Sequence, residues 1–153
     1  MEIIKAEIQD LPEILSLQKL AYQSEAELVN DDSIPPLTQT IEGLTAEFDK
    51  GIILKAVNDR NEIIGSVRGN FSDNTLYIGK LIVCPDCQNQ GNGTSLLSAI
   101  EAVFPNARYE LFTSEKSVKN LYLYAKNGYR EFKREPLNGH TDLIFLEKFI
   151  NQP

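Results

Sequence analysis

Apolar and polar positions repeat along the chain with two different periods, and these periods predict strands and helices in turn. Apolar runs predict strands at 2–6, 52–57, 63–71, 76–83, 107–113, 129–135 and 141–149, and helical stripes predict helices at 10–21, 38–49, 94–104 and 117–127. Asp10 and Glu13 are spaced as a capping box at the start of the first helix. The polar segment 23–36 is expected to be a loop or a broken helix. Adjacent strand runs followed by strand–helix–strand stretches predict a mixed sheet covered by helices.

Length and charge narrow the class of protein. The chain has 153 residues, the size of one domain, and 15 Lys and Arg against 22 Asp and Glu give a formal net charge of −7. So acidic a surface argues against sequence-independent nucleic-acid binding. No apolar run approaches the ~20 residues that span a bilayer, so no membrane association is expected. Two cysteines make no disulfide framework, and the expected compartment is a reducing cytoplasm.

A glycine-rich turn between a predicted strand and a predicted helix is the first candidate for chemistry. The strand end Leu81-Ile82-Val83 leads to Gln88-Asn89-Gln90-Gly91-Asn92-Gly93-Thr94. Glycines at such a junction let backbone N–H groups converge, and the helix N-terminus adds its own, which predicts a phosphate or pyrophosphate site. A Walker loop would need Lys in place of Thr94, and a dinucleotide fingerprint would need Gly in place of Leu96. A turn without any ligand is the alternative.

Two segments carry a resemblance to a known family. The pattern Gln88-x-x-Gly91-x-Gly93 after the strand end resembles the acetyl-CoA loop of the GNAT acetyltransferases, written Gln/Arg-x-x-Gly-x-Gly/Ala. Asn120 and Tyr124, followed by Gly128-Tyr129, resemble a later signature of the same superfamily. The two signals stand in the family's order with a predicted strand between them. The chain is therefore identified as a member of the GNAT superfamily of N-acetyltransferases.

The resemblance implies a fold, a cosubstrate and residue roles. The implied fold is mixed α/β in one domain over 1–153, with a mostly antiparallel sheet of six to seven strands flanked by about four helices. Acetyl-CoA is the implied cosubstrate, whose acetyl group passes directly to a primary amine of a small molecule or peptide. Val83 would offer its amide to the developing oxyanion, and Tyr124 would protonate the departing thiolate. The implied cofactor-binding residues are Leu81, Ile82, Val83, Gln88, Asn89, Gln90, Gly91, Asn92, Gly93, Thr94 and Asn120.

The helical period at 117–127 allows an interpretation independent of any family. Asn120 and Tyr124 are four residues apart and share one face of the helix. The opposite, more apolar side contains Val118, Leu121, Tyr122 and Ala125. This pattern predicts Tyr122 as the core tyrosine and leaves Tyr124 to meet a ligand, with a solvated tyrosine as the alternative.

The acceptor and the general base are less determined. In this superfamily the first helix and the following loop usually border the acceptor site, which implies Tyr22 and Glu25 as acceptor-binding residues. The acidic side chains of this segment would suit a cationic amine, and a solvated acidic loop is the alternative. Many relatives carry a Glu on the strand that ends at Val83, where this chain has Tyr77, Gly79 and Lys80. Glu25, His140 or water therefore remain open as the base.

Other classes of protein compete with the enzyme. Cys84-Pro85-Asp86-Cys87 is a Cys-x-x-Cys, which suggests a thiol redox protein, but the glycine loop separates it from the next helix. A zinc site would need two further ligands, so no metal is expected. A non-catalytic acyl-CoA-binding module is the third class. Dimers are common in the superfamily, so a homodimer is a reasonable expectation.

Overall fold

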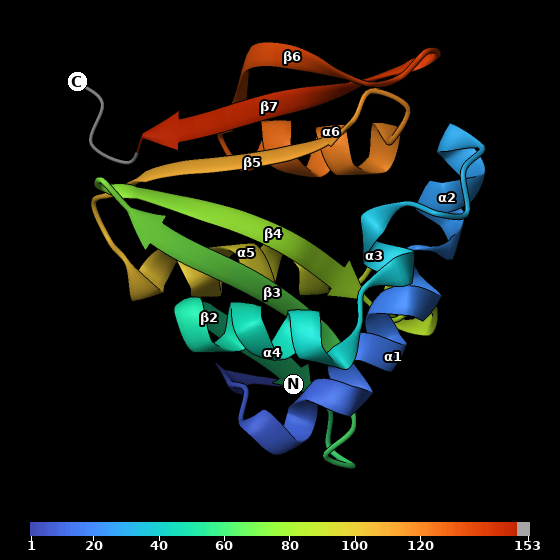
Figure 1. Ribbon diagram of the computed structural model, residues 1–153. Coiled ribbons are helices and arrows are strands. Elements are labelled where there is room, and N and C mark those ends of the chain that lie inside the picture. Colours follow the sequence, from blue (N-terminus) through green and yellow to red (C-terminus); the bar gives the residue numbers. More distant parts are fainter. Residues whose placement is uncertain (150–153) are drawn as a thin grey trace.

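A seven-stranded sheet with the order β1-β2-β3-β4-β5-β7-β6 forms the centre of the structure, a computed structural model that describes residues 1–149 (Figure 1). The strands are β1 (Glu2–Lys5), β2 (Ile52–Val57), β3 (Ile63–Ser72), β4 (Thr75–Val83), β5 (Arg108–Ser114), β6 (Arg130–Asn138) and β7 (Thr141–Phe149). Only β4 and β5 pair in parallel, and every other neighbouring pair is antiparallel. The expected mixed, mostly antiparallel sheet of six to seven strands is confirmed.

Helices cover both faces of the sheet, with α1 and α4 in front and α5 and α6 behind in the view of Figure 1. The helices are α1 (Leu11–Ala21), α2 (Gln23–Val29), α3 (Pro35–Thr38), α4 (Ile41–Lys50), α5 (Asn92–Val103) and α6 (Val118–Lys126), with short 3-10 turns at η1 (Ile8–Asp10) and η2 (Pro85–Cys87). The segment expected to be a loop or a broken helix contains α2 and α3, and α2 ends at Asn30 in a left-handed conformation. Within residues 1–149, no helix is long and apolar enough to cross a membrane.

The start of α1 differs from the sequence expectation. Asp10 makes no side-chain cap for α1, and its carboxylate instead accepts a hydrogen bond from the Glu7 N–H at 2.8 Å. It also pairs with Lys55 at 2.8 Å. Glu13 accepts from the Ile63 N–H at 3.0 Å. The capping box predicted for Asp10 and Glu13 is therefore wrong, because a 3-10 turn precedes α1 and a strand competes for the Glu13 carboxylate.

Apolar side chains gather in two main clusters, one on each side of the sheet. Leu96, Leu97 and Ile100 of α5 pack against the sheet in the larger cluster, to which Tyr124 of α6 also belongs. The second cluster holds apolar side chains of α1 and α4, such as Ile14, and buries them against the opposite face. The clusters anchor helices on both faces of the sheet and hold β4 between them.

The sheet opens between its two parallel strands. Residues 75–77 of β4 pair with residues 108–110 of β5, and no pairing continues beyond them. Figure 1 shows β4 and β5 diverging from that point. Residues 78–83 of β4 therefore keep a strand neighbour only on the β3 side.

An irregularity in β4 lies beside this opening. Gly79 pairs with Arg68 and Ile82 pairs with Ser66, so β4 contains an extra residue relative to β3. Lys80 lies within this bulge and has a left-handed φ of 51°. A bulge re-aims side chains, and here it turns Lys80 and Ile82 to the face that α1 covers.

Gly65 of β3 is a position where the sheet and α5 leave no space for a side chain. A Cβ at Gly65 would lie 2.8 Å from Leu96 Cδ1 and 2.9 Å from the Ile82 carbonyl oxygen. We expect Gly65→Ala to lower the free energy of unfolding by about 1–3 kcal/mol, because overpacking forces the backbone and α5 apart. Urea denaturation checks it, with Gly139→Ala as control, since no atom lies within 4 Å of a Cβ there. Equal stability of the two variants would contradict the packing.

Candidate active site

The loop between β4 and α5 presents a continuous series of backbone donors. Asn89 and Gly91 have positive φ angles of 63° and 82°, which turn successive peptide groups in the same direction. Among the described residues, no backbone N–H group from 88 to 94 donates a hydrogen bond of good geometry to a backbone carbonyl. The last of these belong to the first turn of α5, whose N-terminus attracts anions. The structure thus brings the predicted residues 88–94 together in one loop, whose backbone donors suit an anion.

Side-chain contacts fix the shape of this loop. The Gln88 side-chain amide donates to the Val83 carbonyl oxygen at 3.1 Å, and the Asn92 amide donates to the Cys87 carbonyl oxygen at 2.9 Å. Lys119 of α6 donates to the Gln88 side-chain oxygen at 3.3 Å, which places a cation beside the loop. The sequence reasoning identified the loop but missed Lys119, for which no motif gave a signal.

The backbone of β4 presents polar groups to the opening of the sheet. Cys84 donates its N–H to the Ile64 carbonyl oxygen at 2.8 Å, on the β3 side. Because peptide groups alternate in direction along an antiparallel pair, the N–H of Val83 points to the other side, where β5 has diverged. The Gln88 side chain reaches the Val83 carbonyl from that same side. The predicted residues Leu81, Ile82 and Val83 therefore line the edge of the opening with their backbone.

Helix α6 is rotated relative to the sequence prediction. Tyr124 is buried, with 6% of its surface exposed, whereas Tyr122 and Val118 are 70% and 73% exposed. The prediction of Tyr122 as the core tyrosine is wrong, as is the assignment of Val118 and Ala125 to the buried side. The helix directs its Asn120–Tyr124 face inward because polar partners there satisfy Asn120, which hydropathy alone does not reveal.

A hydrogen-bond network joins α2 to α6 across the opening. The Glu25 carboxylate accepts from the Ser117 hydroxyl at 2.6 Å and from the Asn120 amide at 3.3 Å. The Asn120 amide also donates to Thr113 of β5 at 3.2 Å. Asn120, predicted to contact the cofactor, therefore has protein partners for its amide group in this structure. Glu25, predicted on the acceptor side, lies against α6 and not in a solvated loop.

The tyrosine pair next to this network has altered acidity. Burial raises the pKa of Tyr124 well above that of a free phenol, and the nearby Tyr22 and Glu25 raise it further. Burial and Glu25 likewise raise the pKa of Tyr22, which Arg68 opposes. Both phenols stay protonated at neutral pH, so Tyr124 is a proton donor in its resting state. The predicted residues Tyr22, Glu25, Asn120 and Tyr124 are thus brought together.

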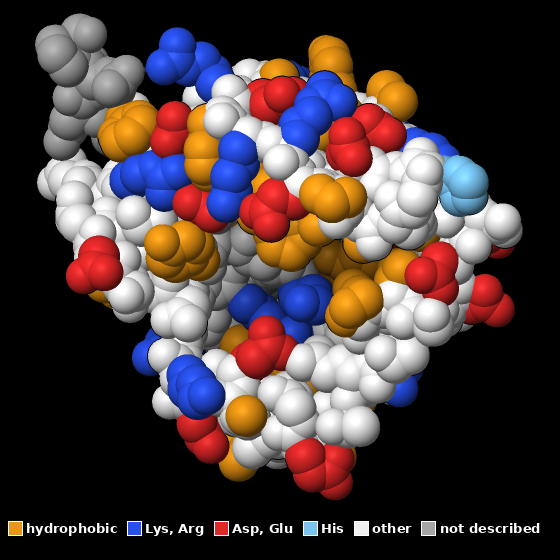
Figure 2. Space-filling view, turned by 45° about the horizontal axis from the view of Figure 1, so that its top comes forward, with side chains coloured by type: hydrophobic (Ala, Val, Ile, Leu, Met, Phe, Trp, Pro, Cys, Tyr) orange, Lys and Arg blue, Asp and Glu red, His pale blue; other side chains and the backbone are white. Residues whose placement is uncertain are grey.

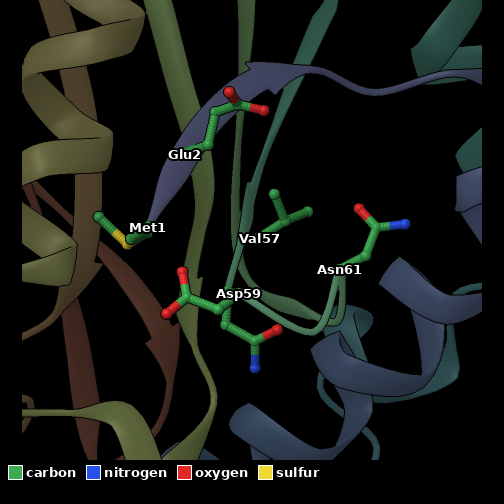
Figure 3. Close-up of a pocket in the computed structure, with 6 residues that line it drawn as sticks. Met1, Glu2, Val57, Asp59 and Asn61 are labelled. Atoms are coloured by element: carbon green, nitrogen blue, oxygen red, sulfur yellow. The ribbon is translucent and has the colours of Figure 1, made fainter.

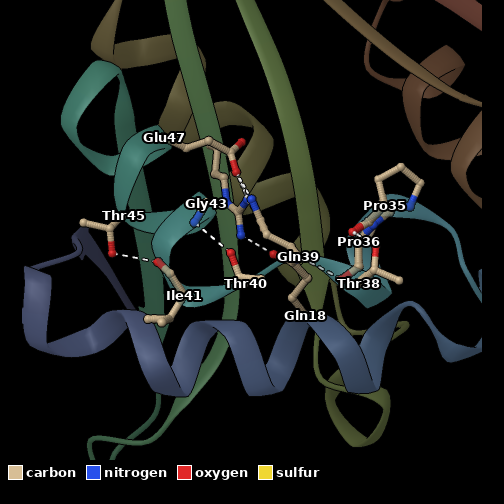
Figure 4. Close-up of polar contacts among 11 residues, drawn as sticks. Gln18, Pro35, Pro36, Thr38, Gln39, Thr40, Ile41, Gly43, Thr45 and Glu47 are labelled. Carbon is tan, nitrogen blue, oxygen red and sulfur yellow. Dashed lines mark hydrogen bonds and ion pairs between the residues drawn. The ribbon is translucent and has the colours of Figure 1, made fainter.

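A buried polar cluster on the α1 side of the sheet was missed by sequence reasoning. Three side chains surround the Arg68 guanidinium of β3: Gln18 of α1, Gln39 between α3 and α4, and Glu47 of α4 (Figure 4). Arg68 Nη1 lies 2.9 Å from Glu47 and 3.1 Å from Gln39, and Nη2 donates to Gln18. Lys80 of β4 is half-buried beside this group. An Arg within an apolar strand run was the signal that could have predicted it.

Figure 2 shows a hollow near the middle of the face, with basic side chains on its floor and an acidic side chain beside them.

A separate pocket lined by Met1, Glu2, Val57 and the β2–β3 turn shares no residue with the loop or with α6 (Figure 3). His140, an alternative base, is an exposed residue of the β6–β7 turn. Cys84 and Cys87 are free thiols at the start of the loop.

The chain belongs to the GNAT acetyltransferase family, because the sequence model described as acetyltransferase (GNAT) domain matches residues 49–131. The matched segment runs from the end of α4 through the loop and α6 into β6. Acetyl-CoA is the cosubstrate of this family. The family and the cosubstrate expected from the sequence are confirmed.

Solved structures support the same fold. The PaiA N-acetyltransferase of Thermoplasma acidophilum in complex with coenzyme A is similar with a TM-score of 0.79 and 19% identity, over 97% of this chain and 98% of that one. The ribosomal-protein-S18-alanine N-acetyltransferase of Escherichia coli is similar with a TM-score of 0.80 and 16% identity, over 99% and 95%.

A curated relative differs in length from this chain. The UPF0157 protein YqkA of Bacillus subtilis (strain 168) is 27% identical over 120 residues, which is 78% of this chain. The match covers 34% of that protein, so the chain spans about a third of the length of the relative.

The burial of Tyr124 has a consequence for alkaline stability. Above pH ~10 an unfolded tyrosine releases its proton while the buried one keeps it, so the native state binds more protons and stability falls as pH rises. The slope is at most about 1.4 kcal/mol per pH unit for one such residue. We expect Tyr124→Phe to reduce this slope in urea unfolding between pH 10 and 12. Tyr122→Phe, at an exposed position, leaves the slope unchanged, and equal slopes in both variants would contradict the burial.

Proposed function

We propose that the protein is an N-acetyltransferase that moves an acetyl group from acetyl-CoA directly to a primary amine. The observation that carries the proposal is the loop of unpaired N–H groups at 88–94, beside the opening between β4 and β5. The two solved relatives described above are both N-acetyltransferases. One domain over 1–153 is part of the proposal, although residues 150–153 lie outside the described residues.

The cosubstrate would occupy the opening of the sheet. The N–H groups of Gln88, Asn89, Gln90, Gly91, Asn92, Gly93 and Thr94 would bind the pyrophosphate, with Lys119 adding charge. The pantetheine arm would lie along the free edge of β4 like an added strand, paired with backbone groups of Leu81, Ile82 and Val83. The Val83 N–H would then stabilise the oxyanion, a contribution of about 3–4 kcal/mol for one preorganised donor.

Tyr124 would protonate the CoA sulfur as the carbon–sulfur bond breaks. Its burial keeps the phenol protonated at neutral pH, and its position beside Glu25 and Tyr22 is on the inward face of α6. Asn120, four residues earlier on that face, would shift its amide from Glu25 to the cosubstrate arm.

Glu25 is the base that the geometry favours over His140. The Glu25 carboxylate is half-buried near Tyr124, whereas His140 is exposed in a turn between strands. The acceptor ammonium would pass a proton to Glu25, which the Ser117 hydroxyl orients at 2.6 Å, and the neutral amine would then attack the thioester. Tyr22 and Glu25 would together border the acceptor. Small molecules and peptides with a primary amine both fit this chemistry.

Several expectations remain predictions. Cytoplasmic location and homodimerisation are two of them. A non-catalytic acyl-CoA-binding module is the alternative function, and it would bind acetyl-CoA without turnover. A thiol redox role for Cys84 and Cys87 is the less favoured alternative, since burial and the neighbouring Cys84 raise the pKa of the Cys87 thiol.

Binding is tested by the melting temperature. With about 1 mM acetyl-CoA and a Kd of about 10 μM, linkage gives about 2.7 kcal/mol of stabilisation. For this chain length that is a shift of about 5–11 °C, and ATP and NAD should give none.

Gly91→Ala should reduce the shift by at least half, because a Cβ at φ 82° distorts the loop. Gly128→Ala carries similar strain at φ 94° outside the loop and should keep the shift. No shift in the wild type would refute the acetyl-CoA site.

Proton donation is tested by turnover. We expect Tyr124→Phe to lower kcat by about 10²- to 10⁴-fold, the usual contribution of a general acid. The acetyl-CoA melting shift of this variant should match that of the wild type, because the phenol acts on the leaving thiolate. Tyr122→Phe is the matched control and should retain full turnover. Unchanged kcat in Tyr124→Phe would remove Tyr124 from the mechanism.

A further inference from the structure

A small group of charged side chains lies on the α1 side of β3 and β4 and has no part in the acetyl transfer described above. Arg68 is 6% exposed, and its Nη1 lies 2.9 Å from a carboxylate oxygen of Glu47. Lys80 is half-buried beside this pair, close enough for both charges to act on it. The group therefore holds two cations and one carboxylate in a partly shielded position.

The described residues do not satisfy these cations completely. Arg68 Nε is buried without a hydrogen-bond partner among them. Lys80 forms no ion pair or hydrogen bond with any residue of 1–149, and the nearby Glu47 is engaged by Arg68 and Gln39. Burial lowers the pKa of Lys80, Glu47 raises it and Arg68 lowers it. A shielded ammonium is costly without a partner, and a bound anion would supply one.

The place of Lys80 in the fold connects this charge with the reaction centre. Lys80 is in the β4 bulge with a φ of 51°, on the face where Ile82 packs against α1 and α4. It precedes Val83 by three residues, about 10 Å along a strand. Arg68, in turn, is near enough to Tyr22 for its charge to lower the pKa of that phenol. The cations thus border the region where the amine and the thioester would meet.

We propose that Lys80, with Arg68 beneath it, binds a carboxylate of the acceptor, so that the preferred acceptors are amines that carry a carboxylate, such as free amino acids. This inference rests on the proposed N-acetyltransferase function and specifies its substrate class. A carboxylate paired with Lys80 would balance the charges of the group. The cations Lys80 and Arg68 would then face two carboxylates, that of Glu47 and that of the acceptor. The acceptor amine would then extend from Lys80 toward Glu25 and the thioester.

The same charges disfavour the class that the acidic helix α2 suggested. A diamine places a second cation where the amino acid places its carboxylate, and that cation would face Lys80 and Arg68. Like charges in a shielded site repel more strongly than in water. The acidic residues Glu27, Asp31 and Asp32 line a surface hollow with Lys19 and Leu37, and this hollow shares no lining residue with the Arg68 group.

The test compares matched acceptors in a thiol-release assay with acetyl-CoA. The panel consists of free amino acids, the corresponding amino-acid carboxamides and diamines, each assayed for kcat and KM. We expect kcat/KM of the wild type to be higher for carboxylates than for their carboxamides by about 10- to 100-fold, the range of a hydrogen bond to a charged group. In Lys80→Met this preference should disappear through a rise in KM for the carboxylates, with carboxamides little changed.

Further variants separate charge from packing. Lys80→Arg keeps the cation and should restore most of the carboxylate preference, whereas Lys80→Glu should reverse the preference in favour of diamines. Lys5→Met, at an exposed position of β1, is the matched control and should behave as the wild type. All variants should keep the acetyl-CoA melting shift, which also shows that they are folded.

The melting shift separates failure of this inference from failure of the proposed function. If the wild type shows no shift with acetyl-CoA, the proposed function itself is refuted. If the shift is present but carboxylates and carboxamides react equally, or only diamines react, the carboxylate site is overturned. The same conclusion follows if no carboxylate in the panel is acetylated, or if Lys80→Met keeps the wild-type preference.

Discussion

The divergence of β4 from β5 after residue 77 is the constraint on which the rest of the structure depends. A strand inside a sheet normally satisfies its backbone on both sides, and unpaired buried N–H and C=O groups are costly. Here residues 78–83 of β4 pair only with β3. The protein satisfies part of the exposed edge itself, as the Gln88 amide does for the Val83 carbonyl. The remaining groups suit an extended ligand, so the topology of the sheet creates the binding site.

An opening of this kind needs support on both sides, or the two halves of the sheet would close. Helix α5 packs beneath β3 and β4, while Tyr124 and Leu123 bring α6 into the same apolar cluster. A Cβ on Gly93 would lie 3.3 Å from Leu123, so the start of α5 and the middle of α6 are in close contact. On the other side, Glu25 connects α2 to Ser117 and Asn120. The opening is therefore bounded by packed elements, which keeps the loop and Tyr124 at fixed positions.

The sequence predicted the features that depend on local chemistry and missed those that depend on how the elements meet. The seven strands and the four longer helices follow from hydrophobic periods, and the loop from its Gln and Gly residues. The rotation of α6 was wrong because Tyr124 is buried at a sheet opening that no periodicity reveals. The bulge at Lys80 was missed because a left-handed Lys carries no turn signal such as Gly or Asn. The Arg68 cluster needs Gln18 and Glu47 from two distant helices.

Both ligands of this acidic protein would carry anionic groups, and this explains why the site relies on short-range contacts. A net charge of −7 repels coenzyme A and carboxylates at long range, although salt screens that repulsion beyond ~10 Å. The loop at 88–94 meets the pyrophosphate with backbone N–H dipoles, which attract an anion without adding net charge. Lys119 at the loop and Lys80 in the bulge add single cations where contact is made. Binding then depends on close contact between each anionic group and its own donors. An anionic group placed elsewhere on the acidic surface would find no attractive charge.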